Sequence, residues 1–583
     1  MSQSAAAPKI SNAPEHSTAY YFIEGLNELG IEHLFCNFGT DHAPTIEAMA
    51  ERQKNGEKVP NVTLCPHENT AAHMAMGYAA VTGRGQAVLV HVDVGTANTA
   101  NAMHNLFRSR LPVLLMSGKA PYTSSNELVG SRDTYVHFVQ EPIDQGALVR
   151  PYMKWEWTLP SGVVVKEALR RAHTIMETKP AGPVYFMAQR ETLTEKWAND
   201  QIRSYAAANY SQPQSGGADP AMIAQLADKL MAAEHPILIC GYAGQSKSAP
   251  KLIEELSAFA GIAVFEGNYT FNISHEFPCF LGFAPNKHLP KADVGLLVDV
   301  DVPWFPADVS HREKSFWAHI DVDTLKSASP MWTFPGNLRM QGDSGVILGQ
   351  LLEALKAKAT PKFKEAAAKR VAAFTAERAA WRESVAKMAT NKGKPDEINP
   401  HYLFAELNKH LKPDDMVFNE GVRNAGACAM QLTRPLPNTC VRSGGGGLGW
   451  SGGMALGAKL AAPNSMCVQV VGDGGFYFGG PSSVFSVAQQ YKLPILVLLL
   501  DNAGWSAVKE STLRVFPQGE AKSSEKFQAD LMPNAEFAKI AEAFGAHGEK
   551  VDNPDDLPAA VERCVKEVRG GRAALLHVRV TKL

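Results

Sequence analysis

Short apolar runs alternate with longer amphipathic stretches along all 583 residues of this chain. The runs have the length of buried strands, and the stretches between them predict the helices that cover such strands. This alternation is typical of parallel α/β units, in which a helix returns the chain across the sheet after each strand. Because the chain is too long for one hydrophobic core, we predict an α/β protein with three doubly wound parallel-sheet domains.

Three blocks of apolar runs give the domain boundaries, at 15–195, 218–358 and 396–583. A polar segment rich in Gly, Pro and Ser at 209–220 predicts a linker. A highly charged stretch at 354–388 is predicted to be helical and to form a solvent-exposed connection between domains. A further helix is predicted at 68–83, ending at Gly83. The strand candidates are 33–38, 86–92, 111–118 and 182–188 in the first block, 235–241, 262–267, 294–301 and 317–323 in the second, and 416–421, 467–474, 493–502 and 573–580 in the third.

The composition narrows the class of protein. The 57 Lys and Arg residues nearly balance 59 Asp and Glu, so no basic surplus indicates a nucleic-acid partner. The longest apolar run, 493–500, is too short to span a bilayer, and residues 1–17 lack the apolar core of a signal peptide and predict a flexible start. The eight cysteines are scattered, as in reduced proteins. We therefore predict a cytoplasmic protein without membrane segments.

Two of the predicted strands end in turns that combine carboxylate or amide side chains with glycine. Gly472-Asp473-Gly474-Gly475 follows one strand, and Asp501-Asn502-Ala503-Gly504 follows the next. The carboxyl ends of neighbouring parallel strands open onto one crevice, so we expect the two turns to lie close together. Asp473, Asn502 and the Gly504 carbonyl offer the oxygen ligands that Mg²⁺ prefers, and glycine N–H groups suit a phosphate. The two turns together predict a site for Mg²⁺ and a phosphorylated ligand.

A competing interpretation comes from 444–449, which reads GGGGLG and contains the G-x-G-x-x-G pattern of dinucleotide-binding proteins. The residues before it, 438–443, form a poor strand candidate, and the segment after it begins without a clear helix cap. A match to this pattern outside a strand–turn–helix context is a weak indication of NAD or FAD binding.

The two turns resemble the GDG…N signature of thiamine diphosphate-dependent enzymes of the acetolactate synthase and benzoylformate decarboxylase (pyruvate oxidase-like) family. The resemblance implies a pyrimidine-binding domain at 15–195, a central domain at 218–358 and a diphosphate-binding domain at 396–583, with Mg²⁺ as the metal. It departs from the family at Asp501, where an asparagine is usual, and in a slightly longer interval between the turns. The implied cofactor contacts are Glu68, Gly447, Leu448, Gly449, Gly472, Asp473, Gly474, Gly475, Asn502, Gly504 and Trp505, with Leu448 as the apolar support of the bent cofactor.

The first block carries the family's glutamate motif. Residues 67–79 read HENTAAHMAMGYA, which places the catalytic glutamate at Glu68. In the family this carboxylate bonds to the aminopyrimidine and favours the tautomer that removes the C2 proton. On its own, an acidic residue here would equally stabilise a helix N-terminus.

Local similarity to benzoylformate decarboxylase implies two further catalytic residues. His91 stands where that enzyme carries an active-site histidine, and Thr40 stands in place of its substrate-binding serine. A histidine can transfer protons near neutral pH, although a strand-end histidine is also often structural. The implied substrate pocket adds Asp41, His42, Gln140, Ala507 and Val508.

Several residues leave the reaction type open. Gln140 and Lys154 lie in segments that resemble acetolactate synthases and therefore favour carboligation. Arg423 binds either phosphate or an anionic substrate, or is a solvated side chain. Trp304 is a possible pocket wall.

The resemblance implies a thiamine diphosphate- and Mg²⁺-dependent carbon–carbon lyase, foremost a 2-oxo acid decarboxylase with carboligase capability. The alternatives are an acetolactate synthase-like transferase, a 2-hydroxyacyl-CoA lyase and a cofactor-binding protein without turnover. The expected substrate is a 2-oxo acid or aldehyde. In the family, the domains that carry Glu68 and Asp473 meet across subunits, which implies a homodimer or homotetramer.

Overall fold

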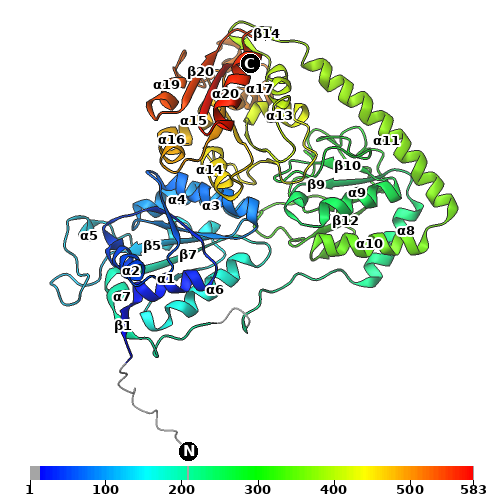
Figure 1. The fold of residues 1–583 in the computed structure, drawn as a ribbon. Coiled ribbons are helices and arrows are strands. Elements are labelled where there is room, and N and C mark those ends of the chain that lie inside the picture. The colour runs from blue at the N-terminus through cyan, green and yellow to red at the C-terminus, as the bar shows by residue number, and fades with distance from the viewer. Residues whose placement is uncertain (1–12, 206–208, 582–583) are drawn as a thin grey trace, which may run out of the picture. The chain divides into compact units, whose positions relative to one another are not determined.

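The computed structural model describes residues 13–205 and 209–581 and confirms the α/β class, with parallel sheets flanked by helices (Figure 1). The described chain divides into two compact units. The first takes the residues up to 79 together with 84–213, and the second takes 80–83 together with the residues from 214 onward. Residues 1–12, the greater part of the predicted flexible start, lie outside the described residues.

The first unit contains a six-stranded parallel sheet with the order β3-β2-β4-β5-β7-β6. The four predicted strands are present as β2, β4, β5 and β7, and all four are buried along most of their length. The two edge strands, β3 and β6, are shorter, are partly exposed and were not predicted. The strand bounds are His33–Asn37 (β2), Asn61–Leu64 (β3), Gln86–Val90 (β4), Val113–Lys119 (β5), Glu156–Thr158 (β6) and Pro183–Gln189 (β7).

Helices connect these strands, and the predicted helix at 68–83 is present as α3, Glu68–Thr82. It ends because Gly83 adopts a φ of 69°, a left-handed conformation that glycine enters without a side-chain clash. The other main helices of the unit are α1 (Thr18–Glu28), α2 (Ala43–Lys54), α4 (Val94–Arg108) and α6 (Val165–Glu177). A short antiparallel pair, β1 (Glu15–Ser17) with β8 (Lys196–Ala198), joins the ends of the unit.

The second unit begins with a five-stranded parallel sheet of order β10-β9-β11-β12-β13. Trp317 on β12 is fully buried, and a Cβ at the neighbouring Gly295 would overlap its ring. Trp304 packs 5.2 Å from the Trp317 ring in the same core, so the possible pocket wall is a core residue instead. The elements are β9 (Pro236–Cys240), β10 (Ala263–Glu266), β11 (Val294–Val298), β12 (Phe316–Asp321), β13 (Leu338–Gln341), α8 (Pro220–Ala232), α9 (Ala249–Ala260) and α10 (Ser344–Lys358).

The charged stretch predicted to be helical consists of two helices. Helix α10 ends at Lys358, and α11 begins at Pro361 and runs to Met388. Thr360 caps α11 because its hydroxyl accepts the Phe363 N–H, and Pro361 has no N–H to lose at the first helical position.

Two arginines in the middle of α11 bind neighbouring parts of the second unit. Arg370 donates to the carbonyls of Ala233, Ala260 and Gly261, and Arg382 donates to Met430 and Thr433. Helix α11 therefore connects the five-stranded sheet to the C-terminal part of the unit, as the long green helix in Figure 1 shows.

The C-terminal part contains a six-stranded parallel sheet of order β17-β16-β18-β19-β21-β20. Its four predicted strands are present, and β19 is buried at every residue. The poor candidate at 438–443 contributes β17, an edge strand of only two residues. The bounds are β16 (Met416–Glu420), β17 (Cys440–Val441), β18 (Cys467–Gly472), β19 (Ile495–Asp501), β20 (His547–Val551) and β21 (Ala574–Arg579).

The pairing register brings the carboxyl ends of β16, β18 and β19 to the same edge of the sheet. Glu420 pairs with Val471, Gly472 pairs with Leu500, and Asp501 pairs with Arg579. The two glycine turns therefore start at adjacent positions, as the parallel arrangement predicts.

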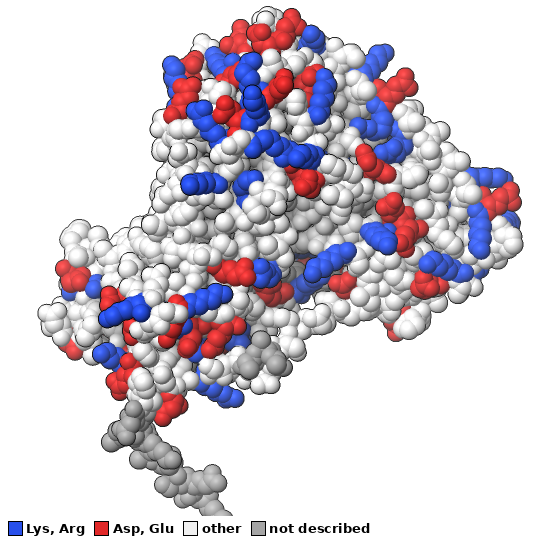
Figure 2. Space-filling model, viewed as in Figure 1, with Lys and Arg blue, Asp and Glu red and all other residues white. Residues whose placement is uncertain are grey.

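Charged side chains of both signs are interspersed over the face shown in Figure 2. Among the described residues, no helix is both long enough and apolar enough to cross a bilayer.

Candidate active site

The second glycine turn folds back onto the first in the C-terminal part. The N–H of Gly504 lies 2.9 Å from Asp473 Oδ2 and 3.2 Å from Asn502 Oδ1, so one donor draws both oxygens together. Burial raises the pKa of Asp473 to about 6, and the nearby Asp501 charge adds to the rise. A buried carboxylate without a compensating cation is a group that a bound metal ion would stabilise.

Asp501, the departure from the family pattern, bonds to two side chains of β21 as well as to its own turn. It accepts hydrogen bonds of 2.8 Å from His577 Nε2, Arg579 Nη1 and the Ala503 N–H. Burial opposes its ionisation, but the bonds from His577 and Arg579 prevail and lower its pKa to about 2. Asp501 is therefore the anionic partner of a buried arginine, whereas Asn502 occupies the turn.

A buried carboxylate that was not predicted, Glu420, holds the glycine-rich loop. It stands at the end of β16 and accepts hydrogen bonds from the Gly449 N–H, the Ser451 N–H at 3.0 Å and the Ser451 hydroxyl. Burial raises its pKa to about 7, although these hydrogen bonds favour the ionised form. Because Leu448 directly precedes Gly449, the carboxylate fixes the backbone beside the predicted cofactor support.

Two positions in this region must be glycine because neighbouring atoms leave no room for a side chain. Gly449 has a φ of 79°, and a Cβ there would overlap the backbone at Phe478 and Gly479. A Cβ at Gly474 would overlap the ring of Trp505.

The remaining predicted residues of this part lie on or beside α17 (Ser506–Val515) and β18. Ala507 and Val508 are exposed on the first turn of α17, directly after Trp505. Arg423 donates to Glu510 Oε1 at 2.8 Å and to the Thr581 carbonyl, so its charge is already paired within the protein. Gly472 precedes Asp473 at the end of β18, Gly475 follows in α15 (Asp473–Phe478), and Gly447 lies in the loop held by Glu420.

In the first unit, His91 is held between two oxygen acceptors. Its Nδ1 bonds to Asp41 Oδ1, and its Nε2 lies 3.0 Å from Gln140 Oε1. Burial disfavours the charged imidazole, but the bond to Asp41 and its charge outweigh burial and raise the pKa of His91. A Cβ at Gly118 would overlap Asp41 Oδ2, and one at Gly39 would overlap the His91 ring, so both glycines make room for the pair.

The loop that carries Asp41 also positions Thr40 and His42. His42 is buried, accepts the Gly39 N–H at Nδ1 and places Nε2 3.3 Å from Asp41 Oδ2. Burial lowers the pKa of His42, which keeps it neutral beside Asp41. Thr40 is exposed, and its hydroxyl lies 2.9 Å from Nε2 of His137, a buried histidine that no motif predicts.

Glu68 begins α3 in the same unit and is 8% exposed. Asn98 donates to its Oε2 at 3.0 Å. A Cβ at Gly95 would lie 3.4 Å from Glu68 Oε1 and 3.3 Å from His91 Cβ, so the two predicted catalytic residues flank one glycine. The first unit thus brings together Glu68, His91, Thr40, Asp41, His42 and Gln140.

Lys154 is used structurally. Its Nζ donates to the carbonyls of Ile175 and Thr178 at the C-terminal end of α6, both at 2.5 Å. Burial lowers its pKa to about 8. The lysine caps this helix and faces neither His91 nor Glu68 within hydrogen-bonding distance.

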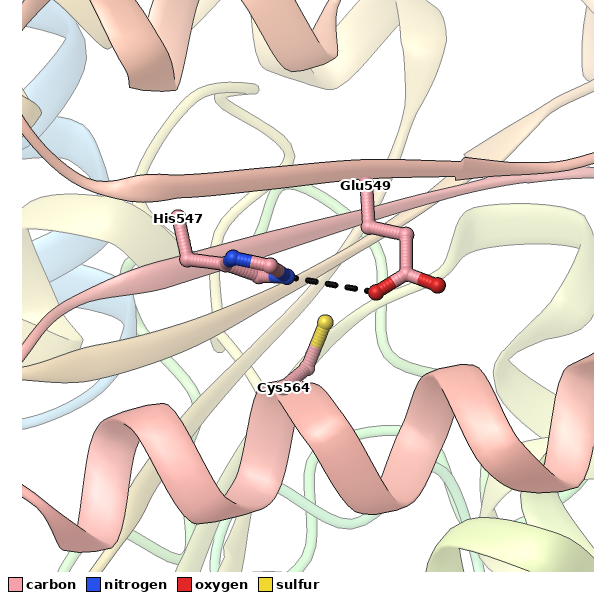
Figure 3. A group of neighbouring side chains, drawn as sticks. All are labelled: His547, Glu549 and Cys564. Carbon is pink, nitrogen blue, oxygen red and sulfur yellow. Dashed lines mark hydrogen bonds and ion pairs between the residues drawn. The ribbon is translucent and has the colours of Figure 1, made fainter.

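Two other features of the second unit lie outside the predicted site. His547, Glu549 and Cys564 converge between β20 and α20 (Leu557–Arg569), as Figure 3 shows. Arg563 already binds both oxygens of Glu549, and burial raises the pKa of the Cys564 thiol to about 12, so this group is an ion pair beside a protonated thiol. A cavity of about 640 Å³ lies beside α11 and includes Tyr269 and Trp381, but none of the predicted site residues lines it.

Comparison with known proteins identifies two thiamine pyrophosphate-binding domains in this chain. Residues 16–148 match the N-terminal TPP binding domain of thiamine pyrophosphate enzymes, and residues 424–578 match their C-terminal TPP binding domain. The acetolactate synthase large subunit of Buchnera aphidicola subsp. Schizaphis graminum is 24% identical, covering 97% of this chain and 95% of the relative. The benzoylformate decarboxylase of Pseudomonas aeruginosa is 25% identical, covering 94% and 96%.

The fold has a counterpart among solved structures. A thiamine diphosphate-dependent 4-hydroxybenzoylformate decarboxylase from Rhodococcus jostii RHA1 superposes with a TM-score of 0.75 at 19% identity, covering 97% of this chain and 99% of that one. At this identity the likeness concerns the fold.

Proposed function

Because this chain belongs to the thiamine pyrophosphate enzymes, we propose that it is a Mg²⁺-dependent 2-oxo acid decarboxylase with carboligase capability. Relatives named for decarboxylation and for acetolactate synthesis are about equally similar to it. The choice between the two reactions therefore rests on the chain's own residues.

The residues of the two glycine turns suit the cofactor and its metal. Asp473, Asn502 and the Gly504 carbonyl would hold Mg²⁺, since the Asp473 carboxylate is buried without a cation and the Gly504 N–H gathers both side-chain oxygens. Thiamine diphosphate, when bound, supplies the carbanion that adds to the substrate carbonyl. Its proposed contacts are Glu68, Gly447, Leu448, Gly449, Gly472, Gly474, Gly475 and Trp505.

The decarboxylase assignment depends on the hydrogen-bonding environment of His91. Both ring nitrogens face acceptor oxygens, from Asp41 and Gln140, and this arrangement is satisfied when both nitrogens carry protons. The hydrogen bond and charge of Asp41 raise the pKa of His91, which favours the protonated ring. Such a histidine can donate a proton to a carbonyl oxygen of the substrate.

The residues proposed to contact the substrate are polar in the first unit and apolar in the second. Thr40, Asp41, His42 and Gln140 supply hydrogen-bonding groups, whereas Ala507 and Val508 supply a small apolar surface on α17. We propose a 2-oxo acid with an apolar side chain as substrate, with aldehydes as acceptors in carboligation.

We further propose a homodimer or homotetramer in the cytoplasm. Each unit exposes large apolar side chains, which in a lone chain would face water. All eight cysteines are free and buried, as expected in a reducing compartment. The exposed side chains include Tyr122, Val129, Tyr135, Phe138 and Ile143 in the first unit and Phe478, Val515, Phe516 and Met532 in the second.

An acetolactate synthase-like transferase is the second candidate, because Gln140 lies in a segment similar to those enzymes and contacts His91 directly. In that reaction a second carbonyl compound, rather than a proton, captures the activated group. A 2-hydroxyacyl-CoA lyase is a weaker alternative.

The test is a screen of 2-oxo acids, with and without acceptor aldehydes, using enzyme loaded with thiamine diphosphate and Mg²⁺ and products identified by mass spectrometry. We expect CO₂ and an aldehyde from at least one 2-oxo acid alone. Product formed only when a second carbonyl compound is present would favour the transferase, and no product from any substrate would refute both.

Cofactor activation is tested separately by hydrogen–deuterium exchange at the cofactor C2. Glu68→Gln should abolish the exchange, whereas Glu365→Gln, at an exposed position of α11, should leave it unchanged. Equal exchange in both variants would show that Glu68 does not activate the cofactor.

A further inference from the structure

Four neutral side chains of the first unit form a buried hydrogen-bond network that no motif predicts. Its centre is Tyr185 on β7, whose Oη lies 2.8 Å from Thr96 Oγ1, 2.6 Å from Ser117 Oγ and 2.8 Å from Gln145 Nε2. Gln145 also donates to the Gly118 carbonyl at 2.9 Å. The four side chains are at most 3% exposed. A phenol oxygen gives one hydrogen and accepts two, so three partners use the whole capacity of the Tyr185 hydroxyl.

The network holds two segments that flank the Asp41–His91 pair. The Gly118 carbonyl belongs to the network, and the Asp41 carboxylate packs so closely against this glycine that a Cβ would overlap it. Ser117 pairs with Val90 across β5 and β4, and His91 directly follows Val90. Both partners of the pair therefore stand next to residues whose positions the network fixes.

Two further segments connect His91 to the network. Gln145 lies five residues after Gln140, whose Oε1 lies 3.0 Å from His91 Nε2. Thr96 lies in the first turn of α4, directly after the loop that leads from His91 into this helix. Within that loop Asp93 has a φ of 34°, an unfavourable conformation for a residue other than glycine. Such a backbone persists only when the structure around it holds both ends, and the network holds the second end through Thr96.

We propose that Tyr185 is a positioning residue for His91. Its hydroxyl keeps the start of α4 and the end of β5 at the separation at which the imidazole contacts both Asp41 and Gln140. Without the hydroxyl, its three partners each lose a buried hydrogen bond, and the segments rearrange to recover partners, because a buried polar group without one is costly. The imidazole then loses its fixed orientation between its two acceptors. This inference rests on the proposed function, in which His91 donates a proton to the substrate.

One test needs no substrate and is therefore independent of the proposed function. Deuterium exchange at the C2 position of the His91 imidazole, followed by mass spectrometry over a range of pH, measures the pKa of this histidine in the full-length protein. Burial lowers the pKa of His91, but the bonds to Asp41 and Gln140 raise it above the ordinary value. Loosening these bonds in Tyr185→Phe should lower it by about one unit. An unchanged pKa of His91 in a folded Tyr185→Phe variant would overturn the proposal.

The kinetic test uses the enzyme loaded with thiamine diphosphate and Mg²⁺ and a 2-oxo acid that the wild type converts. Tyr185→Phe should lower kcat about tenfold and leave KM within about twofold, because the substrate contacts remain while the proton donor is misaligned. The matched control is Tyr21→Phe in the same unit. Tyr21 is 2% exposed, and its hydroxyl donates to the Trp197 carbonyl at 2.9 Å and to Asn199 Oδ1 at 2.6 Å. The control should lower the thermal midpoint but change neither kcat nor the pKa of His91.

Thr96→Val tests the same network from another side, and it remains available if Tyr185→Phe does not fold. Valine keeps the shape of threonine without its hydroxyl. We expect kcat and the pKa of His91 to fall in Thr96→Val, by no more than in Tyr185→Phe, and the double variant to equal Tyr185→Phe, because the tyrosine variant already lacks this bond. Multiplying effects in the double variant, or variants that lose thermal stability while kcat and the pKa of His91 keep their wild-type values, would overturn the proposal. Failure of the proposed function would appear instead in the wild type, as absence of turnover.

Discussion

Replacing Asp501 by asparagine restores the residue that the family resemblance predicts, yet we expect it to destabilise this protein. In the structure the Asp501 carboxylate compensates Arg579, which is only 6% exposed, and also accepts from His577. Asparagine keeps the size of the side chain and an acceptor for the Ala503 N–H, but it leaves Arg579 as a buried cation without its anion.

The loss of folding stability in Asp501→Asn can be estimated in two ways. The shift in the pKa of Asp501 from 3.8 to about 2 corresponds to about 2 kcal/mol at neutral pH. Removing one partner of a buried ion pair typically costs about 3–5 kcal/mol. We therefore expect a loss of about 2–4 kcal/mol, which lowers the thermal midpoint of a domain of this size by roughly 5–15 °C.

The assay is thermal and urea unfolding of Asp501→Asn, Arg579→Met and the double variant at pH 7, with the exposed Asp555→Asn as control. The double variant should lose less than the sum of the single variants, since no charge is then left unpaired. Because the folded pKa of Asp501 is lowered, its contribution is complete above pH 3.8 and disappears as the pH falls towards 2. A midpoint for Asp501→Asn equal to that of the wild type at pH 7 would refute this reasoning.

Three further predictions concern single side chains. The pKa of Glu420 in the folded protein is about 7, above its usual 4.5. The wild type should therefore lose about 3 kcal/mol of folding stability as the pH rises from 4.5 to 7. Urea unfolding of Glu420→Gln at several pH values should lack this decline. Gly118→Ala places a Cβ onto the carboxylate of Asp41 and should lower both the thermal midpoint and kcat, whereas Gly426→Ala, where a Cβ meets nothing within 4 Å, should change neither appreciably. Lys154→Met removes two hydrogen bonds at the end of α6 and should lower the free energy of unfolding by about 1–3 kcal/mol, measured with urea. The ratio of decarboxylation to carboligation products should stay constant. A changed ratio would support a role of Lys154 in carboligation.

The interior strands were predictable because both faces of a parallel sheet are covered. Strands β4 and β19 are buried at every residue and therefore read as continuous apolar runs. Edge strands β3 and β6 have exposed positions, and β17 has only two residues, so their sequences lack this signal. The separation of α10 from α11 could have been predicted from the sequence, since Thr360-Pro361 is a common helix start.

Much of the candidate site could be named from motifs, but its pairings could not. Asp41 and Gln140 each lie about 50 residues from His91, and only the fold brings their side chains together. His137 stands in an apolar tetrapeptide and reads as an ordinary core histidine. Its position three residues before Gln140, on the same helical turn, is the one sequence signal that linked it to the site.

Glu420 was missed for a different reason. It ends a buried strand next to a glycine, as Asp473 does, and the same reasoning about strand ends applies to it. Its role depends on the loop at Gly449 and Ser451, about 30 residues further along, whose path the sequence does not specify.

The two arginines of α11 require a fixed number of helical residues between them. Arg370 binds the part with the five-stranded sheet, and Arg382 binds the C-terminal part. Their separation of twelve residues along the helix sets a distance of about 18 Å along its axis and the angle between the two side chains. One inserted residue would turn Arg382 by about 100° away from its two acceptors, whereas residues 210–219, directly before α8, form no helix or strand. Natural length variation and engineered insertions should therefore be found at 210–219 and excluded from 370–382.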